Sequence, residues 1–473
     1  MKKPDKLLGF INYNDIEHPF EFNEKSFTIT LYPPTKAVWN EYSDPMKLFD
    51  SFTQDTKKHE WIAIKEITGI TSEENHIIFN IQDALSNRNG FISFDVNWYI
   101  CHMDSMAIDK VDGFMISGHD VDIFYPPNIV LETRLEFNNN GKGLEKISVS
   151  SKKQMYESCG KYRVKKNIDA KIKVLAYPNC HQSAWTSPIE SISTMITTFS
   201  TPVGINTIID GYNNLLRFFE YITYRKNVDI GDLHLFHINE EGLRDYSGII
   251  VFPNKNIQES HKNVKERIIP YRILRHHTSR LFTAIKNNEI GFQHLSDSID
   301  NMRRFPASRI IMILAEFERE FRNLYGQDSG RSDEYLEVKS EIILLIERYY
   351  ESKQGKKRQY PKQLRKYVEN RDCSFEANIQ SALSKCEEIL VSFVTRKYPG
   401  TYSEIIQGIS FRMGEVRNGI AHSRLDFNFD AIHLTDIRVI EELTYAIRLS
   451  NMSMSVSDCQ RAISQLFGEN FMF

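Results

Sequence analysis

The sequence lacks a long apolar run. No stretch of its 473 residues is long and apolar enough to span a bilayer. The first ten residues, MKKPDKLLGF, carry lysines but not the apolar core that a secretory signal needs. Hydrophobic residues make up 41% of the chain and charged residues 26%, the ordinary mix of a globular protein. We therefore expect a cytoplasmic protein of two or three domains with no membrane partner.

The sequence also lacks the short signatures of metal sites and phosphate loops. Its six cysteines form no C-x-x-C pair, and in the cytoplasm they are most simply reduced thiols. Cys101, Cys159 and Cys180 are candidate zinc ligands, but core or surface thiols are the preferred interpretation, because an adjacent Cys and His cannot easily bind one ion. Residues 141–143, GKG, lack the spacing of a P-loop, and 117–122, SGHDVD, are interpreted as a turn. We predict no metal and no cofactor.

A strong positive charge over the whole chain is absent as well. The net charge of −3 gives no general attraction to nucleic acid, so a nucleic-acid site has to be a local basic patch. The segment 355-GKKRQYPKQLRKY-367 is such a patch, with two tyrosines and no acid. Its basic residues are Lys356, Lys357, Arg358, Lys362, Arg365 and Lys366. The segment predicts contact with an RNA backbone and stacking of bases on the tyrosines, with a solvated loop between helices as an equally supported alternative.

The first part of the chain has the pattern of β-strands. Short runs rich in β-branched and aromatic residues, several of them alternating with period two, recur between turn signals. The runs are residues 26–34, 76–81, 91–100, 171–178, 232–238 and 248–252. Residues 212–224 have helical spacing instead. We predict a β-rich N-terminal domain over residues 1–290.

From about residue 300 the apolar residues recur with helical spacing. The predicted helices are residues 303–325, 334–351, 375–398, 401–421, 435–452 and 458–467. The polar stretch 285–300 suits a linker. The predicted fold is therefore an α+β multidomain protein, in which the β-rich domain is followed by an all-α bundle over residues 300–473.

The helix predicted over 401–421 is unusual for its glycines. Its core face consists of Ile405, Ile409, Met413, Val416 and Ile420, and a capping box, Thr401-x-x-Glu404, opens it. Gly408, Gly414 and Gly419 lie off this face, and together they weaken the helix by about 2.5–3 kcal/mol. An exposed glycine lets another helix or a ligand approach the backbone, although simple tolerance is an equal alternative.

The same helix ends in the sequence 416-VRNGIAHSR-424. Arg417 offers a planar fork of donors that fits a phosphate, and His422 can accept and donate a proton near neutral pH. Asn418 adds a polar group that can hold a substrate or the imidazole. With the 2′-hydroxyl of RNA as nucleophile these groups suffice for strand cleavage without a metal, whereas the alternative is an ordinary helix end. Arg417 and His422 diverge on an ideal helix, so they meet only if the helix ends near Ala421 or if two copies face each other.

An R-N-x-x-x-H motif at the end of a long helix, in an all-α C-terminal domain that follows a β-rich domain, resembles the ApeA-like branch of the HEPN superfamily. The resemblance implies a metal-independent endoribonuclease that acts in antiviral defence by abortive infection and leaves a 2′,3′-cyclic phosphate and a 5′-hydroxyl. Arg417, Asn418 and His422 would be its catalytic residues, supported by an acid such as Glu415 or one of those in 316-EFERE-320.

The resemblance also implies partners. The substrate would be cellular RNA, with tRNA as one candidate, and the chain would form a homodimer or a higher homo-oligomer. The N-terminal domain would sense a trigger, for which a phage-derived molecule is a candidate, or hold the nuclease silent. The alternative is a non-catalytic HEPN module that binds RNA, a nucleotide or a protein partner.

Overall fold

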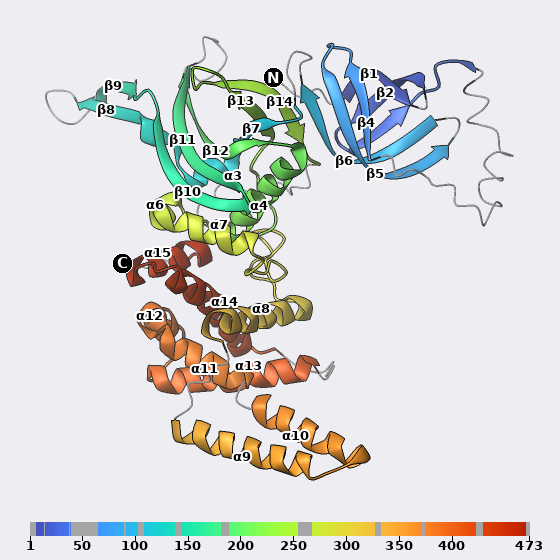
Figure 1. Cartoon of the computed structure of the whole chain (residues 1–473). Helices are drawn as coiled ribbons and strands as arrows, with labels where there is room; N and C mark the ends of the chain where they lie inside the picture. Colours follow the sequence, from blue (N-terminus) through green and yellow to red (C-terminus); the bar gives the residue numbers. More distant parts are fainter. Residues whose placement is uncertain are drawn as a thin grey trace. The chain divides into compact units, whose positions relative to one another are not determined.

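The computed structural model describes most of the chain, and Figure 1 shows its course. The described residues are 6–13, 15–36, 38, 65–88, 91–102, 108–137, 144–180, 189–253, 267–326, 333–370, 374–421 and 429–469. The chain divides into two compact units, residues 1–216 with 227–258 and residues 217–226 with 259–473. The first is β-rich and the second helical, which confirms the predicted order of the two classes. The division falls at residue 258, earlier than the predicted limits of 290 and 300.

Six strands of the β-rich unit close into a ring of antiparallel pairs. They are β1 (Lys6–Tyr13), β2 (Ile16–Asn23), β3 (Thr28–Leu31), β4 (Glu66–Thr71), β5 (His76–Arg88) and β6 (Phe91–His102). β5 pairs with β4 on one side and with β6 on the other, which completes the ring in the order β6-β3-β2-β1-β4-β5. Alternate residues point inward, so Phe20 and Phe22 of β2 and Ile29 and Leu31 of β3 are buried among the aromatic rings at its centre.

The remaining strands of the unit extend this sheet from β6. They are β7 (Val111–Ile116), β10 (Met155–Lys165), β11 (Ile168–Cys180), β12 (Ile189–Val203), β13 (Leu233–Ile238) and β14 (Arg244–Val251), in the order β10-β11-β12-β7-β13-β14. β8 (Leu131–Phe137) and β9 (Leu144–Ser151) form a separate hairpin. Gly211 of α4 (Ile205–Thr223) lies against Phe114 and Phe199, so this part of the helix packs on the sheet.

The interpretation of residues 117–122 as a turn is wrong. Residues His119–Phe124 form the short helix α3, which is followed by the 3-10 helix η1 (Pro127–Val130). Asp120 accepts a hydrogen bond from the backbone N–H of Asp229 at 2.7 Å, and Asp122 accepts one from that of Ser193 at 2.8 Å. Both carboxylates therefore join separate segments of the unit, a structural role that needs no bound ligand.

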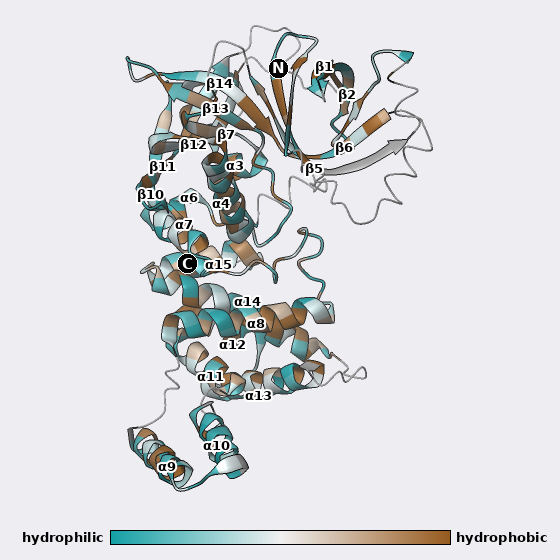
Figure 2. Cartoon of the chain, turned by 45° about the vertical axis from the view of Figure 1, so that its right-hand side comes forward, coloured by the Kyte–Doolittle hydropathy of each residue, from teal (hydrophilic) through white to brown (hydrophobic). Residues whose placement is uncertain are grey.

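The second unit is built around one buried helix. Its elements are α6 (Tyr271–Leu274), η2 (Arg275–His277), α7 (Thr278–Lys286), α8 (Ala307–Tyr325), α9 (Asp333–Glu351), η3 (Gly355–Arg358), α10 (Gln359–Asn370), α11 (Phe375–Lys385), α12 (Glu387–Lys397), α13 (Tyr402–Ala421), α14 (Ala431–Asn451) and α15 (Val456–Phe467). α14 is buried on nearly all sides between residues 436 and 449. α8, α12, α13 and α15 pack around it, as Figures 1 and 2 show.

Three helical predictions need correction. The helix predicted over 375–398 is two helices, α11 and α12, which meet at Cys386 in a non-helical conformation. The segment 355–367, for which a loop was one alternative, is η3 followed by most of α10. The expected linker 285–300 is packed into the unit, with Ile290 and Leu295 buried, because the buried Arg309 donates to backbone carbonyls of residues 294, 301, 302 and 304. Of the helices that the structure describes, none combines the length and the apolar character needed to cross a membrane.

Candidate functional site

The helix that carries the motif, α13, is set by its core face and its N-terminal cap. Ile405, Ile409, Met413 and Val416 are buried as predicted. The capping box is also present, since a carboxylate oxygen of Glu404 accepts hydrogen bonds from the backbone N–H and the hydroxyl of Thr401 at 3.0 and 2.7 Å. These contacts fix the rotation of α13 and therefore the direction in which its last turn points.

The glycines of α13 do not expose its backbone as predicted. Gly414 and Gly419 are buried, and Gly408 is half-buried beside the side chain of Arg412. A Cβ atom at position 414 would collide with the carboxylate of Glu376, so Gly414 lets α11 and α13 of the same chain approach closely. The glycines therefore no longer support an oligomer through this helix.

Arg417 lies at a solvent-facing end of the bundle and has two neighbours. Its Nη2 atom is 3.0 Å from Oε1 of Glu318 on α8, and its guanidinium carbon is 5.3 Å from the ring centroid of Phe375 on α11. Arg322, one turn after Glu318, approaches the same carboxylate at 3.8 Å. The Arg417 side chain keeps 45% exposure, against 17% for Glu318. The acid thus orients the guanidinium while leaving it accessible to a ligand from solvent.

The structure places the other motif residues only in part. Asn418 is exposed on the last turn of α13, next to Arg417. α13 ends at Ala421, as one of the two conditions for convergence requires, but His422 lies outside the described residues. Among the acids proposed to support the motif, Glu318 contacts Arg417 directly, whereas Glu415 is exposed on α13 itself.

The basic segment lies on a helix rather than in a loop. Lys357, Arg358, Lys362, Arg365 and Lys366 are exposed; the side chain of Lys356 is outside the described residues. Two members already have protein contacts, because Arg365 pairs with Glu347 at 2.5 Å and with Glu369 at 2.7 Å, and Arg358 lies over the ring of Tyr350. Lys362 and Lys366 are therefore the better candidates for a phosphate contact.

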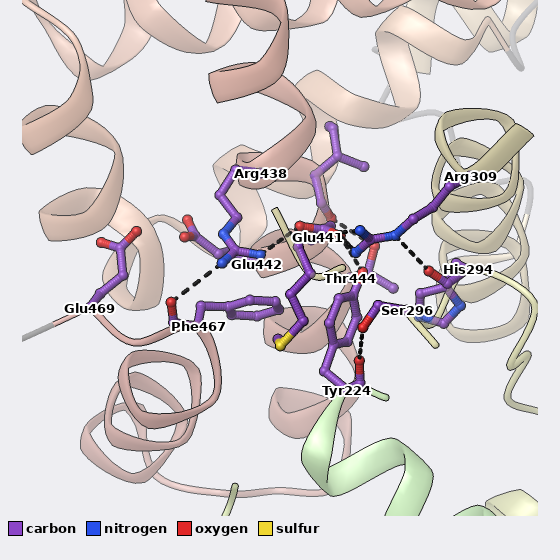
Figure 3. Close-up of polar contacts among 12 residues, drawn as sticks. Tyr224, His294, Ser296, Arg309, Arg438, Glu441, Glu442, Thr444, Phe467 and Glu469 are labelled. Carbon is purple, nitrogen blue, oxygen red and sulfur yellow. Dashed lines mark hydrogen bonds and ion pairs between the residues drawn. The ribbon is translucent and has the colours of Figure 1, made fainter. Parts of the chain in front are cut away.

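A network of buried charges crosses the core around α14 (Figure 3). Glu441 receives Arg309 from α8 at 2.9 Å, Arg438 at 2.8 Å and the hydroxyl of Tyr224. Lys397 of α12 contacts a carboxylate oxygen of Glu442 at 2.7 Å. These groups are paired within the protein, so the network is a structural one.

Burial shifts two groups of this region in opposite senses. Burial raises the pKa of Glu442 to about 7, against the opposing effect of Lys397. Burial, helped by the charge of Arg309, lowers the pKa of His294 to about 3. Within the part of the chain that the structure describes, neither ring nitrogen of His294 has a hydrogen-bond partner. His294 is therefore a neutral core residue rather than a proton carrier.

A pocket of about 450 Å³ opens beside this network. Three arginines and two aromatic rings contribute to its wall, together with one acid; these residues are Arg303, Arg396, Arg438, Phe305, Phe467 and Glu469. Figure 3 shows that Arg438 lies between Glu441 and the backbone carbonyl of Phe467 at the edge of this region. A pocket with an excess of arginines and with aromatic walls suits a small anion that carries a ring.

The candidate zinc ligands do not form a site among the described residues. Cys159 is buried and Cys101 half-buried, both as free thiols, and burial raises the pKa of each. The side chain of Cys180 is outside the described residues. In the ranges that the structure describes, no group of three or more His, Cys, Asp and Glu side chains could hold a metal ion.

Comparison of the chain with models of known protein families, with curated proteins and with solved structures finds no match. The function has to be argued from the motif and from what surrounds it.

Local sequence patterns pointed to only part of what surrounds the motif. Glu318 was one of several acids in 316–320, and helical spacing alone could not select it, because its partner lies on another helix. The pocket arginines come from the segment before α8, from α12 and from α14, so no local pattern could have grouped them.

Proposed function

We propose that the protein is a metal-independent endoribonuclease of the HEPN type, with Arg417, Asn418 and His422 as its catalytic residues. The observation that carries the proposal is the environment of Arg417. An arginine at the end of a bundle helix is held by Glu318 of another helix and still has 45% of its side chain exposed. Such an arginine can bind a phosphate from solvent, as a catalytic anion clamp has to do.

In the proposed reaction, His422 removes the proton of the RNA 2′-hydroxyl, and the oxygen attacks the adjacent phosphorus. The bond from phosphorus to the 5′-oxygen breaks, and the leaving oxygen takes a proton. The products are a 2′,3′-cyclic phosphate and a 5′-hydroxyl. Arg417 stabilises the negative charge that gathers on the phosphoryl oxygens, and Glu318 keeps its guanidinium in place. Asn418 is next to Arg417 and would hydrogen-bond the substrate or the imidazole.

The proposal includes a biological setting. The enzyme would act in the cytoplasm on cellular RNA, with tRNA as a candidate substrate, in an antiviral response of the abortive-infection type. The β-rich unit would sense the trigger, for which a phage-derived molecule is a candidate. Lys362 and Lys366, which are exposed on α10, would contact the RNA backbone together with the rest of the basic segment.

The decisive experiment compares RNA ends after incubation with the wild-type chain and with His422→Ala. We expect cyclic phosphate and 5′-hydroxyl ends with the wild type and a rate lower by about 10²–10⁴-fold with the variant. His433→Ala is the matched control, because His433 lies near the start of α14 and not in the motif. Equal cleavage by His422→Ala would refute the assignment of the proton carrier.

A second candidate function is supported by the pocket beside Arg438. The protein would then be a non-catalytic module that binds a nucleotide, with the phosphates near Arg303 and Arg396 and the base near Phe305 or Phe467. Calorimetric titration with nucleoside mono- and triphosphates tests this alternative. Saturable binding that Arg303→Ala weakens, in a protein without nuclease activity, would favour the second function over the first.

A further inference from the structure

The helical hairpin of α9 and α10 carries an apolar surface that its own contacts leave uncovered. The two helices run antiparallel, since Lys339 donates to the backbone carbonyl of Glu369 at 2.9 Å and Glu347 pairs with Arg365. The half-buried residues of α9 that face α10 include Ile343, Ile346 and Tyr350. Figures 1 and 2 both draw the two helices side by side with each other.

A second apolar stripe of α9 faces solvent. It consists of Tyr335, Val338, Ile342, Leu345 and Tyr349, which are exposed by 38, 54, 42, 61 and 57%. The spacing of these residues is three, four, three and four, which is the repeat of a helix seam that packs against other helices in a bundle or coiled coil. A solvated helix has no reason to maintain this repeat with large apolar side chains, and Figure 2 shows brown, hydrophobic stretches on α9.

α10 adds a matching stripe to the same surface. Tyr360, Leu364 and Tyr367 follow one another at spacings of four and three and are exposed by 65, 58 and 74%. On each helix the stripe lies about a quarter-turn from the face that contacts the other helix. Because the helices are antiparallel, both stripes come out on the same side of the hairpin. Lys362 and Lys366 fall on the other side of α10, which leaves them free for a different ligand.

The two halves of this surface carry opposite charge. α9 contains six acids and two basic residues, whereas η3 and α10 together contain six basic residues and one acid. A partner has to offer positive charge opposite α9 and negative charge opposite α10. A second copy of the same hairpin does so when a two-fold axis runs parallel to the helices, because α9 then lies antiparallel on the partner's α10 at both contacts.

We infer that the α9–α10 hairpin is a dimerisation element, which joins two copies of this chain through a four-helix contact. The apolar stripes form its centre, and the acidic and basic helices select the pairing of α9 with α10 over that of α9 with α9. The inference rests on the exposure, spacing and charge of the hairpin and does not depend on the proposed nuclease activity.

The test is the mass of the full chain in solution, measured by light scattering after size exclusion. We expect twice the mass of one chain at micromolar concentration. Ile342→Glu with Leu345→Glu should raise the dissociation constant at least about 100-fold, because two carboxylates would be buried in the contact. Leu344→Glu is the matched control, since Leu344 is 51% exposed on the opposite side of α9 and should leave the dimer intact.

A cross-linking experiment tests the pairing itself. The intrachain contacts place Leu345 level with Leu364, so the proposed axis brings Leu345 of one chain beside Leu364 of the other. A mixture of Leu345→Cys chains and Leu364→Cys chains should be cross-linked by a short thiol reagent far more than either chain alone. A monomer up to high micromolar concentration, or a dimer that is insensitive to the double glutamate variant, would overturn the inference.

Discussion

Arg309 and Arg417 both pair with a glutamate in the helical unit, but their surroundings differ. The Arg309 side chain is 9% exposed and Glu441 fully buried, whereas Arg417 is 45% exposed and Glu318 17%. A buried pair stabilises little against an apolar alternative, yet the removal of one partner leaves a charge without solvent or counterion. An exposed pair contributes only a few tenths of a kcal/mol to about 1 kcal/mol. The comparison teaches that the first pair holds the fold, while the second is free to act on a ligand.

The largest expected effect comes from breaking the buried pair. Glu441→Ala should lower the free energy of unfolding by about 3–5 kcal/mol, because Arg309 and Arg438 are both deprived of their carboxylate. Glu318→Ala should lower it by at most about 1 kcal/mol. Urea denaturation of the two variants beside the wild type measures both values. Equal decreases in stability would erase the distinction between the two pairs.

The exposed pair should show the reverse behaviour. Arg417→Ala is expected to reduce RNA cleavage by about 10²–10³-fold, because the phosphoryl charge is left without its clamp, with a change in stability within about 1 kcal/mol. Arg417→Lys should also be a poor enzyme, since a lysine cannot reproduce the planar fork. Initial rates of cleavage, measured on samples whose folding has been checked by denaturation, provide the test. A fully active Arg417→Ala would remove this residue from the mechanism.

The pH dependence of stability sharpens the comparison further. The raised pKa of Glu442 means that the folded state holds this proton more tightly than the unfolded chain does, so stability should fall as the pH rises from about 4.5 to about 7. The slope from one such group is at most about 1.4 kcal/mol per pH unit. Glu442→Gln should flatten it, because the amide does not titrate. Denaturation midpoints between about pH 5 and pH 8 provide the measurement.

His294 gives the opposite sign and serves as the control. Its lowered pKa means that the unfolded chain takes up the proton first, so this residue lowers stability as the pH falls from about 6.5 toward 3. His294→Leu should remove that decrease. If the slopes of the two variants change in the same direction, the pKa directions are wrong.

The smallest effect concerns the basic segment. If Lys362 and Lys366 neutralise phosphates of a single RNA strand, replacing both by Gln should reduce the slope of log affinity against log salt by about 0.7 for each phosphate concerned. Arg365→Gln should change the slope less, because this arginine is already held by Glu347 and Glu369. Binding titrations at several salt concentrations test both statements. An unchanged slope in the double lysine variant would remove α10 from the RNA path.

Several features of the fold could be predicted because they depend on neighbours in the sequence. The core face and the capping box of α13 are set by residues within a few positions of one another, and both are as predicted. The break at Cys386 could not be predicted, because the apolar spacing continues through α11 and α12. α10 was hidden by its charges and by Pro361, which a helix tolerates in its first turn.

The sequence by itself determined the order of a β-rich and a helical part and the position of Arg417 and Asn418 on the last turn of α13. These follow from periodicity and local hydrogen bonding, which act over a few residues. Only the tertiary structure decided which acid meets Arg417, why Gly414 is a glycine, and which apolar stripe of α9 is left exposed. Each of these depends on helices distant in the sequence that pack together, and the spacing of residues along one helix does not say which neighbour will cover it.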